Sequence, residues 1–403
     1  MDGPQLVTAV EEALRRSVIV DDPAADRFPW VPRRVFKKLR VSSAEKERLI
    51  AVIQAQDELA IFDNRLQVLC GLAHQVTHQD LADWLVARAH EAGATAVVEE
   101  LKRYLREKEI PFLEVAALSG VSVAEPSDLA RGIRVIPLSE VPDSLAKDLV
   151  FSEPIPLLLG THRPSPSAAL TCRSLLPKSH PRPGIQDLSL GEGRRQELLD
   201  ACLLLTLQGP SAPFCVGSYA IPEPWIPCQQ IAGVGISRPF AVETPFLHTV
   251  PLTSEMLEHA KHLHERFTSL SEPSKAKLRI SVERLNWAMR RPWLADKAID
   301  LGVAFEALFL SDREPDRGEL GFTLRIRGAR FLGSSLGERI EIAELIRRIY
   351  RIRSEAVHTG IAPPQVNGID SKDLLQEGVR LLARALDKVL RCGVPDWLQL
   401  VLE

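Results

Sequence analysis

The chain contains no long apolar segment. Its longest apolar runs, such as LLLG and CLLLTL, fall far short of the roughly 20 residues that a membrane-spanning helix needs. The first residues, MDGPQLVTAVEEALRR, also lack the basic start and apolar stretch of a secretory signal. We therefore expect a cytoplasmic protein with no membrane partner.

Signatures of metal and nucleotide binding are also missing. The six cysteines form no CxxC pair, which is atypical of a zinc site or a disulfide framework and fits free thiols in a reducing compartment. His74 and His78 stand four residues apart, but no third well-placed ligand accompanies them. No Walker or dinucleotide glycine motif is present. The sequence thus predicts no metal and no other cofactor.

Composition and charge are those of ordinary globular proteins. The 403 residues carry a formal net charge of −3, with 45% hydrophobic and 26% charged residues. This length exceeds what one hydrophobic core usually spans, so we expect two or three domains. Any contact with nucleic acid requires a local basic patch, because the whole chain attracts no polyanion.

Proline divides the chain into three parts. Thirteen of the 29 prolines lie between residues 151 and 240, a density that helices and central strands do not accommodate. Residues 43–109 instead carry apolar side chains at helical spacing. We predict an α+β multidomain fold with a helical N-terminal region (residues 1–115), a Pro-rich mixed α/β middle of loops and short strands (116–250) and an all-α helical bundle (251–403). Residues 1–250 are alternatively one sensor or regulatory unit.

Four amphipathic helices are predicted in the C-terminal part. The first opens at Pro273 and ends at Pro292, and the second follows at once and stops before the segment SDREPDRG. The third covers residues 337–357 and the fourth residues 371–390, each with one apolar stripe. Four such helices predict a bundle.

A short motif lies near the end of the third helix. Residues 350–360 read YRIRSEAVHTG, with four residues between Arg353 and His358. This string resembles the RxxxxH signature of HEPN domains. Three stretches, KAIDLGVAFEALF, ELGFTLRIRGARFLG and ERIEIAELIRRIYRIRSEAVHTG, are similar in order and interval to those of the Apea-like HEPN family. The resemblance covers residues 254–403 and departs from the family at Thr359, which separates the histidine from Gly360.

The resemblance implies an activity and a form of assembly. Many HEPN domains are metal-independent endoribonucleases that build their site across a homodimer, so we expect an RNA substrate and a dimer formed through the bundle. Apea-like HEPN proteins resemble anti-phage effectors, which implies defence or toxin-like growth arrest. Residues 1–250 then sense or regulate, through a phage-derived trigger or an inhibitory partner protein. Two alternatives stay open: a catalytically silent HEPN module that dimerises and binds RNA or a partner, and a HEPN partner of a nucleotidyltransferase.

The residue types suit RNA cleavage on chemical grounds. RNA carries its own nucleophile, the 2′-hydroxyl, so cleavage needs a group that exchanges a proton and a fixed cation beside the phosphate. His358 is the candidate for proton exchange. Arg353 is the candidate cation, because a guanidinium keeps its charge and binds two phosphate oxygens. Ser354 and Tyr350 lie four and eight residues before the histidine, so their hydroxyls are expected to orient the imidazole.

Helical geometry separates the two main candidates. Five residues at about 100° each place Arg353 and His358 roughly 140° apart around the helix axis. Three arrangements bring them to one phosphate: the arginine side chain bends round, the helix distorts near Gly360, or a second protomer supplies the missing groups. The third matches the dimeric site that the resemblance implies.

A basic patch surrounds the motif. Between residues 321 and 353, eight arginines stand against three glutamates, a concentration of charge that suits a phosphate backbone. The expected RNA-binding residues are Arg327, Arg347, Arg348 and Arg351, with Glu306 and Arg339 in supporting places. Some of these arginines have glutamates one turn away, as Arg348 has Glu344, so we expect half of the patch to be structural.

Overall fold

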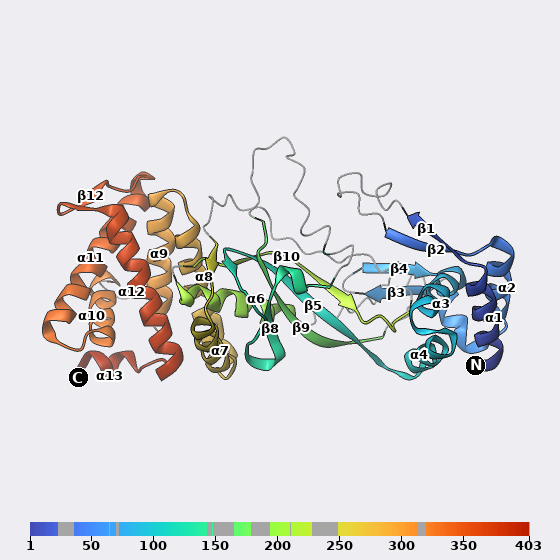
Figure 1. Ribbon diagram of the computed structural model, residues 1–403. Coiled ribbons are helices and arrows are strands. Elements are labelled where there is room, and N and C mark those ends of the chain that lie inside the picture. Colours follow the sequence, from blue (N-terminus) through green and yellow to red (C-terminus); the bar gives the residue numbers. More distant parts are fainter. Residues whose placement is uncertain are drawn as a thin grey trace.

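The computed structural model describes residues 1–22, 36–63, 65–69, 72–142, 147, 165–178, 194–209, 211–227, 249–312 and 320–402. Three parts follow one another along an elongated molecule: N-terminal helices, a central antiparallel sheet and a C-terminal bundle (Figure 1). The protein therefore has an α+β fold with a helical C-terminal region. None of the helices in these ranges combines the length and the hydropathy that crossing a bilayer requires.

The N-terminal part packs helices around one core that contains Leu6, Leu49, Leu85 and Leu101. Its helices are α1 (Gly3–Arg15), α2 (Ser43–Gln54), the 3₁₀ helix η2 (Asp57–Phe62), α3 (His78–Ala92) and α4 (Ala94–Arg106). Two antiparallel strand pairs accompany them: β1 (Val18–Asp22) with β2 (Phe36–Arg40), and β3 (Arg65–Leu69) with β4 (Leu72–Val76).

The second hairpin corrects the expectation of helix throughout residues 43–109. The leucines at positions 66, 69 and 72 have a helical spacing, yet Leu69 and Leu72 are paired across an antiparallel ladder. Three apolar residues at an interval of three are too short a run to distinguish a helix from a hairpin, and here the backbone pairing decides.

The middle part is built on a five-stranded antiparallel sheet in the order β10-β5-β9-β8-β7. Its strands are β5 (Glu109–Ser119), β7 (Ser127–Asp128), β8 (Ile133–Pro137), β9 (Ala168–Pro177) and β10 (Phe214–Pro222). The described residues of this part also form shorter elements: β6 (Val121–Ser122) paired with β11 (Val250–Pro251), η3 (Ala130–Gly132), η4 (Leu138–Glu140), α6 (Arg195–Leu204) and η5 (Leu205–Gln208).

Two expectations about the middle part differ from the structure. Strands β5, β9 and β10 have 11, 10 and 9 residues, so they are not short. Proline permits this length because Pro177 and Pro222 close β9 and β10 rather than interrupt them. The boundary at residue 115 also falls inside β5. Phe112 packs into the N-terminal core and Leu118 into the core between the sheet and α6, so one strand serves both parts.

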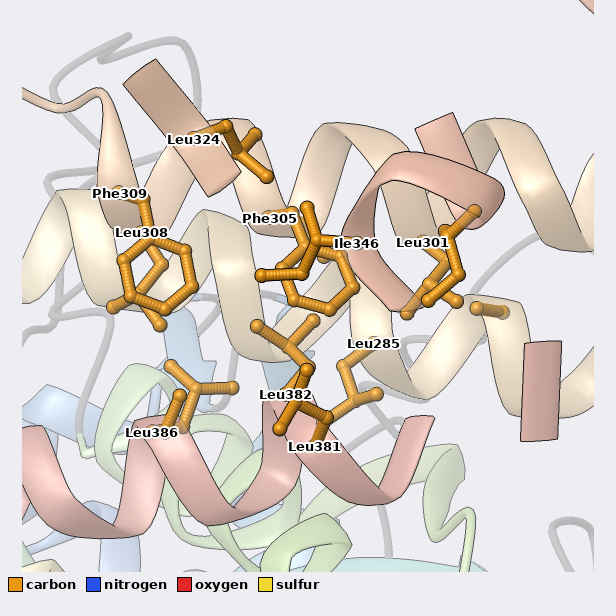
Figure 2. Close-up of a cluster of buried hydrophobic side chains, with 14 of the residues drawn as sticks. Leu285, Leu301, Phe305, Leu308, Phe309, Leu324, Ile346, Leu381, Leu382 and Leu386 are labelled. Atoms are coloured by element: carbon orange, nitrogen blue, oxygen red, sulfur yellow. The ribbon is translucent and has the colours of Figure 1, made fainter. Parts of the chain in front are cut away.

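Within residues 249–312 and 320–402, the C-terminal part contains the four predicted helices and three more. The predicted ones are α8 (Glu272–Arg290), α9 (Leu294–Phe309), α11 (Leu336–Thr359) and α12 (Ser371–Cys392). The additional ones are α7 (Ser254–Thr268), α10 (Leu320–Leu332) and α13 (Trp397–Leu402). A two-residue ladder, β12 (Gln365–Val366) with β13 (Ile369–Asp370), joins α11 to α12 and is an exception to an all-α bundle. Figure 2 shows how Leu301, Phe305, Ile346 and Leu382 meet in the bundle core.

The sheet and the bundle share buried contacts. Leu204 of α6 belongs to the bundle core. The Arg279 guanidinium on α8 donates to both carboxylate oxygens of Asp200 on α6, at 2.6 and 2.8 Å. Asn286 on α8 is 1% exposed, and its side-chain amide donates to the Thr206 hydroxyl and to the Pro213 carbonyl oxygen. The bundle is therefore fixed against the sheet by both apolar and polar contacts.

Candidate functional site

The RxxxxH motif lies at the C-terminal end of α11. Ser335 caps the start of this helix by accepting a hydrogen bond from the Glu338 amide. Gly360 ends it in the left-handed conformation, with φ of 74°, which glycine adopts without strain. Thr359 is accommodated as the last helical residue, and its hydroxyl donates to the Glu355 carbonyl oxygen. His358 therefore occupies a regular last turn.

His358 is exposed on the outward face of α11. Within the described ranges its ring forms no hydrogen bond or ion pair. Residues four, seven and eleven positions earlier, Ser354, Arg351 and Arg347, fall within about 40° of it around the helix axis. Of the two arginines, Arg351 is exposed and forms no ion pair with any described residue. One stripe of α11 thus carries an exposed imidazole, a half-buried serine and an exposed guanidinium that pairs with no acidic residue in the described ranges.

Arg353 points elsewhere, onto α9. Its Nη2 lies 3.4 Å from Oε1 of Glu306, and its guanidinium carbon lies 5.5 Å from the ring centre of Tyr350. Its Nε is buried without a partner among the described residues. The four-residue spacing of the motif therefore does not bring Arg353 and His358 together within one chain.

A glycine that the sequence reasoning missed makes this placement possible. A Cβ on Gly302 of α9 would lie 2.6 Å from Cγ of Arg353, closer than two carbons approach without one of them moving. Gly302 is buried and stands one turn before Glu306. The stretch KAIDLGVAFEALF indicates a close approach at this glycine, because the glycine interrupts an otherwise good helix-forming segment four residues before a glutamate.

Tyr350 belongs with Arg353 and Glu306 rather than with His358. Burial raises the pKa of Tyr350, and the charge of Glu306 raises it further against the opposing effect of Arg353. The phenol thus keeps its proton at neutral pH and acts as a donor. Ser354 lies beside His358 on the helix, but within the described ranges its hydroxyl makes no hydrogen bond to the imidazole. The orienting contacts expected from both hydroxyls are therefore not formed in the single chain.

The expectation that Arg327 binds RNA does not agree with its position. Arg327 is 7% exposed, and Nη1 donates to the Phe309 carbonyl oxygen at 2.7 Å. Both terminal nitrogens also bind the Asp312 carboxylate, at 2.5 and 3.1 Å. Three of the five N–H donors of this buried guanidinium are taken by acceptors inside the fold, which disfavours a role in binding phosphate. Arg327 holds the end of α9 against α10.

Of the other basic residues, some form contacts within the fold and one is exposed without an ion pair among the described residues. Arg347 and Arg348 both donate to Glu344, at 2.7 to 3.0 Å. These hydrogen bonds, the one from Arg347 foremost, lower the pKa of Glu344 to about 2. Arg339 donates to the Gly333 carbonyl oxygen at 3.0 Å and so fixes the turn between α10 and α11. Of this set, Arg351 on the His358 stripe is the basic residue without an ion pair in the part of the chain that the structure describes.

The described residues contain no group of three or more His, Cys, Asp or Glu side chains arranged to hold a metal ion. The chain was compared with protein-family models, with curated proteins and with solved structures, and none of the three comparisons gave a match.

Proposed function

We propose that this chain is a metal-independent endoribonuclease of the HEPN type that works as a homodimer through its C-terminal bundle. The observation that carries the proposal is the outward stripe of α11, on which His358 is exposed in the last turn with the free Arg351 about two turns before it. An exposed imidazole next to unpaired positive charge is what transfer of a proton beside a phosphate requires.

In the proposed reaction the 2′-hydroxyl of a ribose attacks the adjacent phosphorus. His358 accepts the proton as the bond between the 2′-oxygen and phosphorus forms, and the bond from phosphorus to the 5′-oxygen breaks. A proton then passes to the leaving oxygen from a protonated imidazole. The products are a 2′,3′-cyclic phosphate and a 5′-hydroxyl, so the step consumes no water and needs no metal.

A second copy of the chain completes the site. Arg353 is held by Glu306 on the side of α11 away from His358, so within one protomer the phosphate meets Arg351, since Arg347 is paired with Glu344. Two α11 helices facing each other across a two-fold axis place both stripes in one groove, which doubles the local positive charge. In this arrangement Arg353 is a positioning residue that fixes α11 on α9.

The proposed biological role is conditional RNA cleavage in anti-phage defence or growth arrest. Uncontrolled RNA cleavage harms the cell that makes the enzyme, so such an enzyme requires restraint. Residues 1–250 are proposed to supply it through a trigger or an inhibitory partner protein. Their shared strand β5 and their buried contacts with α8 give a physical route from that part to the bundle.

The test uses the full chain, a mixed-sequence RNA pool and excess EDTA. We expect 5′-hydroxyl ends to appear with the wild type and to decrease at least about 100-fold with His358→Ala, the usual contribution of a general acid–base group. Arg351→Ala should reduce cleavage about tenfold and Arg15→Ala should leave it unchanged, because Arg15 lies on α1 at the other end of the molecule (Figure 1). Equal cleavage by all variants, or cleavage that EDTA abolishes, contradicts the proposal.

One observation favours a second candidate, a silent module that dimerises and binds RNA or a partner protein. The ion pair between Arg353 and Glu306 resembles an ordinary helix-packing contact and leaves the motif arginine away from any substrate. This candidate predicts intact RNA in the same assay, with a dimer that survives both His358→Ala and Arg351→Ala.

A further inference from the structure

Helix α7 lies in the joint between the sheet and the bundle (Figure 1). Its residues Leu257 and Ala260 pack into the core between the sheet and α6. Leu263 and Phe267, about one and two turns after Ala260, pack into the bundle core. One helix therefore holds the two parts together through two separate sets of apolar contacts.

A buried histidine lies beside these contacts. His264 of α7 is 1% exposed, and neither of its ring nitrogens has a hydrogen-bond partner among the described residues. The neutral ring is the form that suits such surroundings, because an imidazolium carries two N–H donors and a charge that burial penalises heavily. The closed joint therefore accommodates His264 without its second proton.

The charged groups that act on His264 are already paired with one another. On α6, Asp200 accepts from Arg279 of α8 through both of its oxygens. Glu197, also on α6, accepts from Arg194 at 2.7 Å, and its carboxylate lies 3.8 Å from Nε of Arg131 on η3. The two carboxylates that attract the ring are thus both taken by arginines.

The other elements packed against α7 offer no ready partner either. Helix η5 carries no charged residue. Other acidic residues on or beside α7 lie within 3.5 Å of basic partners: Asp387 of α12 with His259 and Arg391, Asp128 of β7 with Arg134, and Glu258 and Glu265 with His262. A second proton on His264 therefore requires either a rearranged ion pair or access to water.

Backbone strain lies at the same joint. Arg131 of η3 has a φ of 59°, a left-handed conformation that residues other than glycine adopt at a cost. Its carbonyl oxygen accepts a hydrogen bond from Nη2 of Arg194 at 2.6 Å, which fixes η3 on the start of α6. Because a displacement of α6 lets Arg131 relax, this strain favours opening of the joint.

The direction of the pH effect follows from burial. Burial lowers the pKa of His264 from 6.5 to about 4, against the attraction of Asp200 and Glu197 and together with the repulsion of Arg131 and Arg194. An open joint exposes the ring to water and restores its ordinary pKa. The open form then binds protons more tightly, so the closed joint loses stability as the pH falls from about 6.5 towards 4.

We propose that His264 is a proton switch that opens the joint between the sheet and the bundle under acidic conditions. When the ring takes up a proton from solvent, the imidazolium draws Asp200 or Glu197 away from its arginine, and α7 separates from α6 and η3. The switch needs neither RNA nor a second copy of the chain, so it stands apart from the proposed cleavage.

The test measures backbone hydrogen exchange of the full chain at pH 7 and pH 5, expressed as protection relative to an unfolded peptide. We expect the protection of α7 to fall about 20-fold in the wild type, the ratio that pKa values of 6.5 and about 4 give. In His264→Leu, which takes up no proton, the fall should stay below about threefold. Helix α4 of the N-terminal core is the internal reference and should also change less than about threefold.

A second histidine on the same helix provides the matched control. His262 is 64% exposed, so His262→Gln should lose protection in α7 as the wild type does. Circular dichroism at pH 7 shows whether His264→Leu folds, and His264→Gln, which is neutral and polar, serves as a second variant. An undiminished α7 in the wild type, a fall that α4 shares in full, or an equal fall in a folded His264 variant overturns the proposal.

Discussion

At the scale of single residues, the position of Arg353 depends on the glycine beneath it. We expect Gly302→Ala to destabilise the protein by about 1–3 kcal/mol, because the new methyl group forces Arg353 away from Glu306 in a packed interface. Urea unfolding measures the loss. The same variant should reduce RNA cleavage, since α11 no longer seats on α9 in the same way.

A second glycine provides the matched control. Gly337 lies in the first turn of the same α11, and the nearest atom to an added Cβ there is the Ser335 hydroxyl at 4.0 Å. Gly337→Ala should leave stability unchanged or raise it by up to about 1 kcal/mol through the unfolded state. If both variants behave alike, the close approach of Arg353 to Gly302 does not determine the position of that side chain.

Residue types could be read from the sequence, whereas their partners could not. The motif identified His358 and Arg353, and the structure places the first on the surface and the second against Glu306. Counting charge placed Arg327 in a binding patch, because a count does not show that Asp312 and the Phe309 carbonyl enclose it. Contacts between distant segments decide which arginines are free, and spacing along one helix does not contain that information.

At the scale of elements, Glu344 of α11 makes the stability of the folded chain depend on pH, because it pairs with two arginines. The pKa of Glu344 lies at about 2 in the folded chain against an ordinary value of 4.5, so its stabilisation is present above about pH 4.5 and is lost as the pH falls towards 2. Glu344→Gln should lower stability at pH 7 by less than about 1 kcal/mol, since the ion pairs are partly exposed. Urea unfolding at pH 7 and pH 2 should show this difference vanish at the lower pH.

Another acidic residue on the same helix serves as the comparison. Glu341 is exposed and forms no ion pair with any described residue. Glu341→Gln should therefore leave stability nearly unchanged at pH 7. A loss in Glu344→Gln that persists undiminished at pH 2 contradicts an origin in the two arginine contacts.

Helix ends were easier to predict than strands. Pro273, Pro292 and Gly360 delimit helices through backbone chemistry that is local to the chain, and the observed ends of α8 and α11 lie within a few residues of the predicted ones. The hairpin β3–β4 and the long strand β5 depend on pairing with distant backbone, which a local pattern does not reveal. Helix α10 was not predicted as part of the bundle, because its buried positions include Arg327 and Gly328 and so lack a clean apolar stripe.

At the scale of the whole molecule, the contact between α6 and α8 ties the sheet to the bundle. Arg279→Ala removes the two hydrogen bonds that Arg279 donates to Asp200, which is 8% exposed. Among the described residues, Gln196 is then the side-chain donor that remains to this buried carboxylate. We expect a loss of about 3 kcal/mol and one cooperative unfolding transition, since the sheet and the bundle share this contact. Denaturant unfolding followed by both tryptophan fluorescence and circular dichroism checks both expectations.

An exposed ion pair within the sheet is the control for this loss. Arg134 and Asp128 pair across β7 and β8 with side chains 53% and 75% exposed, so Arg134→Ala should cost less than about 1 kcal/mol. Two separate transitions, with Arg279→Ala shifting neither of them, contradict a sheet and a bundle that are joined through α6 and α8.

The central claim is that the bundle cleaves RNA through the ribose hydroxyl without a metal. The most direct measurement incubates the full chain in EDTA with two oligonucleotide pools of the same sequence composition, one of RNA and one with 2′-deoxyribose throughout, and identifies the ends of any fragments. The account predicts that only the RNA is cut, leaving 2′,3′-cyclic phosphate and 5′-hydroxyl ends. Intact RNA, equal cutting of both pools, or fragments with 5′-phosphates contradict it.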